Sequence, residues 1–288
     1  MVITAAEWMV AGRRLVAAAG SVVGNRYRDN FDVLHLGNER PLVVVADGMG
    51  DGPGSSAAGR TSVEVFVREA VRGNGAAALR HAVAEVQRAV REAGSSLPDL
   101  TGCTLTAFVA DGSGLAGSDA AGNGAARDGT AGNGWTGVGP AGNGVGGAGV
   151  GGVGEAAAWI VQLGDSRVYR VRDRCFELLT TDHTAAWLGM LNGWYAPGSR
   201  EAQRDRYRLT RYAGHPGMPE PDLLNVSLRA GDLLLLCTDG VSDQIDDRTL
   251  AQVLDGSVDP AVLVERLLMR TLDNGGDDNA TAVIIAVR

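Results

Sequence analysis

The sequence predicts an α+β fold in which sheets and helices form separate layers. Apolar runs rich in β-branched residues recur along the chain and are typical of buried strands. Two helical stretches follow each other at residues 55–72 and 76–93, with no strand between them. Strands therefore come in runs instead of alternating with helices, as they would in βαβ units. With 288 residues and 45% hydrophobic content, the chain can form one full domain, which we place over residues 1–288.

The first strands are predicted from short apolar runs. Residues 14–19 begin one strand, and residues 42–46 form a buried strand that ends at Asp47 before a glycine-rich turn. Between them, polar residues 24–32 precede the apolar run 33–36, as in a loop or edge strand that enters the core. The charged residues of this segment fit a solvated edge and an active-site role equally well.

Both helices after the Asp47 turn are predicted to pack against the core. Ser55 or Ser56 is a suitable N-cap for the first helix. The second helix places its apolar residues on one face and its arginines elsewhere. The apolar residues are Leu79, Val83, Val86 and Val90.

The second half of the chain adds further strands. Residues 102–110 and 159–163 are strand-like, and residues 166–172 follow as a hairpin partner of the latter. A mixed polar segment over 184–221 is predicted to be a mobile lid. The remaining elements are strands at 223–228, 233–237 and 282–287 and a helix that Asp259 caps and that ends near 272.

A low-complexity insertion separates two of these strands. Residues 111–154 are mostly Gly, Ala and small polar residues, and Ala-Gly-Asn-Gly recurs at 121, 131 and 141. Such a segment buries too little apolar surface to offset its ordering entropy. We therefore expect a flexible insertion that catalysis does not need.

Composition excludes several function classes. All 26 basic residues are Arg, so mechanisms that use a phosphate-loop, kinase or Schiff-base lysine are impossible. The net charge of −8 argues against a nucleic-acid partner. No apolar stretch reaches membrane-spanning length and no leader peptide is recognisable, so we expect a soluble, cytoplasmic monomer. Cys103, Cys175 and Cys237 are predicted to be reduced and buried.

Four carboxylates stand at the ends of apolar strands. Asp47, Asp165 and Asp239 each follow one, and Asp278 precedes the last. A single Asp-Gly is usually a turn, but four carboxylates that converge repel one another unless cations lie among them. Mg²⁺ or Mn²⁺, which prefer oxygen ligands, would fit. The lone His183 has no second histidine at ligand spacing, and we expect it to be structural.

The chain resembles the bacterial PPM, or PP2C-like, family of metal-dependent serine/threonine protein phosphatases. The resemblance rests on seven motifs in the family's order, which together cover nearly the whole chain apart from the insertion. They are Asn30-Phe31-Asp32, Asp47-Gly48-Met49-Gly50, Gly102-Cys103-Thr104, Gly164-Asp165-Ser166-Arg167-Val168-Tyr169, Leu179-Thr180-Thr181-Asp182-His183, Cys237-Thr238-Asp239-Gly240-Val241-Ser242-Asp243 and Asp278-Asn279-Ala280-Thr281.

The resemblance implies a four-layer αββα sandwich, with two central antiparallel β-sheets flanked by helix pairs and with two Mn²⁺ or Mg²⁺ ions, or three, at one end. By motif, Asp47 would bridge two metals, the Gly48 carbonyl would be a ligand, and Asp239 and Asp278 would hold one metal.

The same resemblance assigns two further aspartates and the chemistry. Asp32 would contact metal-bound water, Asp165 would hold the third ion, and the 184–221 segment would be a flap beside the site. It implies that a metal-bridging water hydrolyses phosphoserine or phosphothreonine, with Asp47, Asp239 and Asp278 as the catalytic residues. A phosphorylated protein and a Ser/Thr kinase would be its partners.

Two positions depart from the family pattern. Phe31 stands where Glu or Gln is usual, and Tyr27 stands where the phosphate-binding Arg is usual. In an extended strand, Arg26 and Arg28 would share a face with Asp32, so we expect one of these two arginines to bind phosphate.

Two rival functions use the same fold. The first is a signalling module that binds a phosphoprotein without hydrolysing it; the intact carboxylates argue against it. The second is a phosphatase that acts on an anti-sigma-factor antagonist. A sensor domain fused to the chain would have favoured this function.

Overall fold

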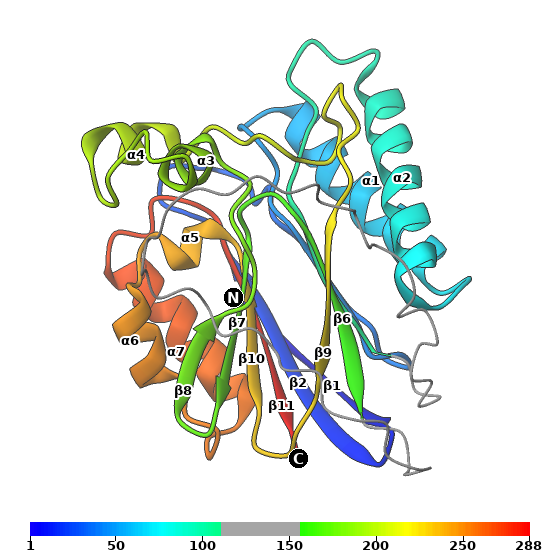
Figure 1. Cartoon of the computed structure of the whole chain (residues 1–288), viewed down its shortest axis with the longest axis vertical. Coiled ribbons are helices and arrows are strands. Elements are labelled where there is room, and N and C mark those ends of the chain that lie inside the picture. The colour runs from blue at the N-terminus through cyan, green and yellow to red at the C-terminus, as the bar shows by residue number, and fades with distance from the viewer. Residues whose placement is uncertain (111–155) are drawn as a thin grey trace, which may run out of the picture.

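Two antiparallel sheets face each other at the centre of the molecule (Figure 1). The computed structural model describes residues 1–110 and 156–288, so the predicted insertion lies outside the described residues. The six-stranded sheet has the order β1-β2-β11-β10-β7-β8, and the five-stranded sheet has the order β3-β4-β5-β6-β9. The strands of the first are β1 (Ile3–Val10), β2 (Arg13–Val22), β7 (Arg167–Arg172), β8 (Cys175–Leu178), β10 (Leu233–Cys237) and β11 (Ala280–Val287). Those of the second are β3 (Val33–Leu36), β4 (Leu42–Ala46), β5 (Leu105–Ala110), β6 (Ala157–Leu163) and β9 (Asp222–Ser227).

Helices lie outside the two sheets (Figure 1). They are α1 (Pro53–Ala70), α2 (Gly75–Gly94), α3 (Ala185–Leu191), α4 (Arg200–Asp205), α5 (Asp239–Ser242), α6 (Asp247–Val253) and α7 (Pro260–Asp273). The pair α1 and α2 packs on the five-stranded sheet, and α5, α6 and α7 pack on the six-stranded sheet (Figure 1). The predicted four-layer αββα sandwich is confirmed.

Three buried clusters hold the layers together. The central one joins the inner faces of the sheets, for example Leu15 and Val283 with Phe108 and Ile160. A second lies between α1, α2 and the five-stranded sheet, and it contains the four apolar residues predicted on the face of the second helix. A third lies under α7. Burial of this continuous apolar surface is the main stabilising term.

The predicted hairpin of residues 159–172 is wrong. Strand β6 pairs with β5 and β9 in one sheet, whereas β7 pairs with β8 and β10 in the other. The chain changes sheets at Gly164, whose φ of +115° suits glycine, and a Cβ there would press against the backbone and side chain of Thr104. A change of sheet and a hairpin have the same local sequence pattern.

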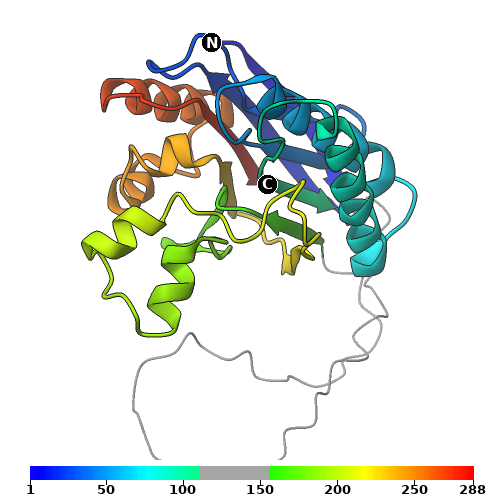
Figure 2. The ribbon, with the colours of Figure 1, turned by 90° about the horizontal axis from the view of Figure 1, so that it is seen from above.

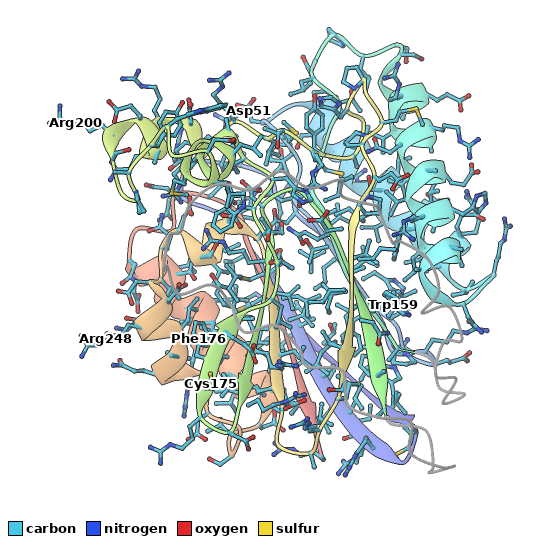
Figure 3. All side chains as sticks on the ribbon, viewed as in Figure 1. Asp51, Trp159, Cys175, Phe176, Arg200 and Arg248 are labelled. Carbon is cyan, nitrogen blue, oxygen red and sulfur yellow. The ribbon has the colours of Figure 1, made fainter. Side chains whose placement is uncertain are left out.

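Three smaller expectations also need correction. Strand β1 precedes the predicted first strand and pairs with it through a tight turn at Ala11 and Gly12, both with positive φ. Helix α1 begins at Pro53 with Gly52 as its N-cap, because proline's fixed φ suits the first helical position. Cys175 is exposed in edge strand β8, toward the opposite end of the molecule from Asp51 (Figure 3).

In the described residues no helix has the length and apolar character needed to cross a bilayer. The assignment of residues 1–288 to a single domain stays a prediction.

Candidate metal centre

The four strand-end carboxylates lie together. Asp47, Asp165, Asp239 and Asp278 line one cavity of about 510 Å³, and Gly48 lines it too. The first two extend from the ends of β4 and β6 in one sheet; the other two flank β10 and β11 in the other. Because β10 and β11 pair antiparallel with Cys237 opposite Ala282, the end of one lies beside the start of the other. The sandwich therefore brings together carboxylates up to 231 positions apart in the chain, from Asp47 to Asp278.

Asp32 is buried and is not among the residues that line this cavity. Its Oδ2 accepts hydrogen bonds from the hydroxyls of Thr238 (2.9 Å) and Thr281 (2.7 Å). Its Oδ1 is buried and has no hydrogen-bond partner among the described residues, and the same holds for Oδ1 of Asp239. Buried polar atoms are normally paired, so these two oxygens indicate that a ligand belongs here.

Burial and mutual repulsion disfavour the ionised carboxylates. Burial, followed by the charges of Asp239 and Asp32, raises the pKa of Asp47 well above its usual range. Burial and Asp239 also raise the pKa of Asp165 and of Asp278. Burial raises the pKa of Asp32 to about 7, although its two threonine hydrogen bonds oppose the rise. Such a cluster is suited to a cation, which would reverse each of these shifts.

Two glycines allow the Asp278 segment to approach the site. A Cβ at Gly24 would overlap the backbone of Asp278, and a Cβ at Gly240 would overlap the carbonyl of Asn279. The backbone N–H of Gly24 also donates to Oδ1 of Asn279 at 3.0 Å. A larger residue at either position would force this backbone segment to shift.

The extended strand expected at residues 26–32 is wrong. The chain turns there, with the Tyr27 N–H donating to the Gly24 carbonyl at 3.1 Å, so the expected alternation of faces does not apply. Tyr27 and Phe31 line the cavity, whereas Arg26 and Arg28 are exposed and do not. The charge of Arg26 does oppose the rise of the Asp278 pKa, so Arg26 is near the site. A phosphate-binding role for either arginine stays a prediction.

Known proteins share this fold. No family model matches the chain. It is 35% identical over 129 residues to the serine/threonine protein phosphatase PstP of Mycobacterium tuberculosis, covering 44% of this chain and 24% of that protein. It is 28% identical over 125 residues to the protein phosphatase PhpP of Streptococcus pneumoniae, covering 43% and 51%. The chain thus spans from a quarter to about half of the length of these curated relatives.

Solved structures match nearly the whole chain, among them two serine/threonine phosphatases. The PPM Ser-Thr phosphatase MsPP from Mycobacterium smegmatis, in complex with cacodylate, has a TM-score of 0.70 and 26% identity over 94% of this chain and 97% of that one. The catalytic domain of PstP in complex with two manganese ions has a TM-score of 0.65 and 27% identity over 95% and 98%. The resemblance to the bacterial PPM phosphatases is confirmed.

The donor set fits the hard divalent cations of the PPM family. Within residues 1–110 and 156–288, no three His, Cys, Asp or Glu side chains lie close enough to hold one ion by themselves. Mg²⁺-type ions are usually held by one or two carboxylates and several waters, so they do not require such a group of three. The two buried oxygens without partners at Asp32 and Asp239 support the same fit.

The predicted lid supplies part of the cavity wall. Its helices α3 and α4 stand outside the sandwich, as the view from above shows (Figure 2). An ion pair between Arg206 and Asp243 ties it to the end of α5. Tyr207 and Leu209 follow and line the cavity. That the lid is mobile stays a prediction.

Several lining residues were not foreseen from the sequence. Asp99 and Leu100 come from the loop between α2 and β5, and Asp51 lies at the same end of the molecule as α3 and α4 (Figure 3). No local pattern marks these residues. Thr238 and Thr281, which bond Asp32, stood inside the quoted motifs, but their role depends on contacts between segments far apart in sequence.

His183 is structural, as expected. It is buried; its Nδ1 accepts from the Gly164 N–H at 3.1 Å, and its Nε2 lies 3.0 Å from Oδ2 of Asp222. Burial lowers the pKa of His183, so the ring is neutral and its Nε2 donates to Asp222. It therefore fixes the backbone directly before Asp165.

We expect His183→Ala to destabilise the protein by about 2–4 kcal/mol, because it leaves a cavity and an unpaired buried N–H. Urea unfolding of the metal-free protein measures this loss. The control is His81→Ala on the exposed face of α2, which should change stability by less than about 0.5 kcal/mol. Equal unfolding midpoints for the two variants would contradict the structural role.

Proposed function

We propose that this chain is a metal-dependent protein phosphatase that hydrolyses phosphoserine and phosphothreonine. The observation that carries the proposal is the convergence of four strand-end carboxylates from both sheets on one cavity. The repulsion among them, which contributes to the raised pKa values of Asp47, Asp165 and Asp278, has no structural benefit in a protein that only binds. The names of the relatives, serine/threonine protein phosphatases, support the same reaction.

Five residues would hold the metals. Asp47 and the carbonyl of Gly48 would be ligands together with Asp239 and Asp278, and Asp165 would hold a third ion. When bound there, Mn²⁺ or Mg²⁺ would neutralise phosphoryl oxygens and lower the pKa of water, which allows hydrolysis without a covalent phosphoenzyme. The relative crystallised with two manganese ions supports this choice of metal.

Asp32 is suited to take the proton that the attacking water loses. Its Oδ2 is held by Thr238 and Thr281, which leaves Oδ1 as the oxygen that can be protonated.

The substrate would be a phosphorylated protein, which a Ser/Thr kinase would supply. The cavity lining also includes apolar and aromatic side chains, among them Phe31, Met49 and Leu100, and these would contact the residue that carries the phosphate.

Hydrolysis of p-nitrophenyl phosphate by the purified protein tests the proposal. We expect turnover in Mn²⁺ and none after the metal is removed with EDTA, because the cavity lining of the described chain offers no Lys, Arg or His to neutralise phosphate. Release of phosphate from a phosphothreonine peptide should follow the same metal dependence. A protein that binds the phosphopeptide in saturating Mn²⁺ without hydrolysing either compound would instead be the non-catalytic module.

A further inference from the structure

The cavity offers few groups that could donate a hydrogen bond to a phosphate. Its described lining contains four strand-end carboxylates but no arginine or histidine. Metals alone leave part of a phosphoryl group without donors, since a phosphate accepts several hydrogen bonds. The remaining donors would be backbone N–H groups of the glycine-rich turn in the lining, neutral polar side chains, or groups outside the lining.

Most neutral polar side chains in the lining are already engaged. The Thr104 hydroxyl accepts from the Asp47 N–H at 2.9 Å and pairs with the Ser166 hydroxyl at 2.8 Å. The Asn279 side chain accepts from the Gly24 N–H and donates to the Asp29 carbonyl. Two phenols, Tyr27 and Tyr207, remain among the lining residues.

Of these two phenols, Tyr27 is the one fixed beside the carboxylates. Its backbone is held in the turn that begins at Gly24, and its ring packs edge-on against Phe31 with centroids 5.9 Å apart. It lines the same cavity as Asp47 and Asp278. Tyr207 lies on the lid, 67% exposed, with the guanidinium of Arg206 over its ring.

A tyrosine hydroxyl also has the right chemistry. Its ordinary pKa near 10 keeps it protonated and able to donate at neutral pH, and burial with the nearby carboxylates raises the pKa of Tyr27 further. As a neutral donor, it binds phosphate less tightly than a guanidinium would and retains the product less.

We propose that Tyr27 binds the substrate, with its hydroxyl donating a hydrogen bond to a phosphoryl oxygen in the carboxylate cavity. This inference rests on the proposed phosphatase function and names a phosphate-contacting residue within it. It assigns to Tyr27 the role that the sequence alone had suggested for Arg26 or Arg28.

Inorganic phosphate is the probe, with its dissociation constant measured by calorimetry on the Mn²⁺-loaded protein. Tyr27→Phe keeps the ring and its contact with Phe31 and removes only the hydroxyl, so we expect phosphate to bind about tenfold more weakly. Tyr27→Arg puts a cation at the same place and should bind phosphate more tightly than the parent, with stronger product inhibition. The matched control is Tyr212→Phe, which removes a hydroxyl outside the cavity lining and should leave phosphate affinity unchanged.

Two outcomes would overturn the inference. Phosphate affinity equal to the parent's in Tyr27→Phe would show that the hydroxyl makes no contact, and so would a parent protein that binds no phosphate in Mn²⁺. Failure of the proposed function is a separate result, because it is read from the absence of p-nitrophenyl phosphate hydrolysis by the parent. If the parent binds phosphate and this binding depends on Tyr27, but the parent does not hydrolyse p-nitrophenyl phosphate, the Tyr27 contact is supported and the proposed phosphatase function is contradicted.

Discussion

Replacing Asp47 or Asp239 with Asn is expected to reduce Mn²⁺-dependent turnover by orders of magnitude while the fold survives. Both carboxylates line the cavity from different sheets, and the charge of Asp239 raises the pKa of Asp47, Asp165 and Asp278, so it lies at the centre of the cluster. An amide has the same shape but lacks the charge that holds a divalent cation. Steady-state kinetics on p-nitrophenyl phosphate over a Mn²⁺ titration would measure the loss.

The metal-free forms of these variants should be more stable than the metal-free parent. Removing one charge from a repulsive cluster favours the folded state, so thermal unfolding in EDTA should shift upward. The control is Asp277→Asn, which removes the same charge next to Asp278 from an exposed side chain outside the cavity lining. We expect this variant to keep turnover within about twofold of the parent. Near-parental turnover of Asp47→Asn or Asp239→Asn in saturating Mn²⁺ would contradict the assignment of the site.

The stability of the metal-free protein should fall as the pH rises toward neutrality. The pKa of Asp32 is about 7 in the folded protein, above the ordinary value near 3.8, so between these values the folded state binds more protons than the unfolded state. This contribution is therefore fully present below about pH 4 and is lost as the pH rises through about 7. The raised pKa values of Asp47, Asp165 and Asp278 act in the same direction.

Urea unfolding in EDTA from pH 5 to pH 8 measures this effect in the parent and in Asp32→Asn. Buried His183 has a lowered pKa and acts in the opposite direction, but it contributes equally to both proteins, so their difference reports the Asp32 carboxyl together with its effect on Asp47. The advantage of Asp32→Asn over the parent should grow with pH across this range. Mn²⁺ should stabilise the parent more at pH 8 than at pH 5, because ionised carboxylates bind it. A pH-independent difference between parent and variant would contradict the raised pKa of Asp32.

Local patterns predicted elements well where one physical signal dominated. The one-sided apolar spacing of Leu79, Val83, Val86 and Val90 predicted α2, and these four residues are buried. The Asp259-Pro260 pair predicted the start of α7, where the Asp259 side chain accepts from the Ala261 N–H. Both signals lie within one or two turns of a helix, so they need no knowledge of the rest of the chain.

Such local patterns could not predict which distant segments of the chain pair with each other. The run that ends at Leu163 and the run that begins at Arg167 suggest a hairpin, yet they belong to different sheets, because only the packed sandwich determines which strands are neighbours. Likewise, residues 26–32 looked extended, but the contact of Gly24 with the Asp278 backbone and the bond from its N–H to Asn279 hold the chain in a turn. These contacts join segments far apart in the chain, and the energy of such long-range packing overrides local β-propensity.

The sequence by itself determined the chemical inventory of this protein: carboxylates at four strand ends, no lysine, and a set of motifs in the order of the PPM phosphatases. Each of these features can be recognised from residues that are neighbours in the chain. Only the tertiary structure decided that the four carboxylates share one cavity, that Asp32 is buried with a raised pKa, and that Tyr27 rather than Arg26 or Arg28 lines the cavity. Burial, charge repulsion and the direction of a side chain depend on neighbours hundreds of positions away, and folding alone brings those neighbours together.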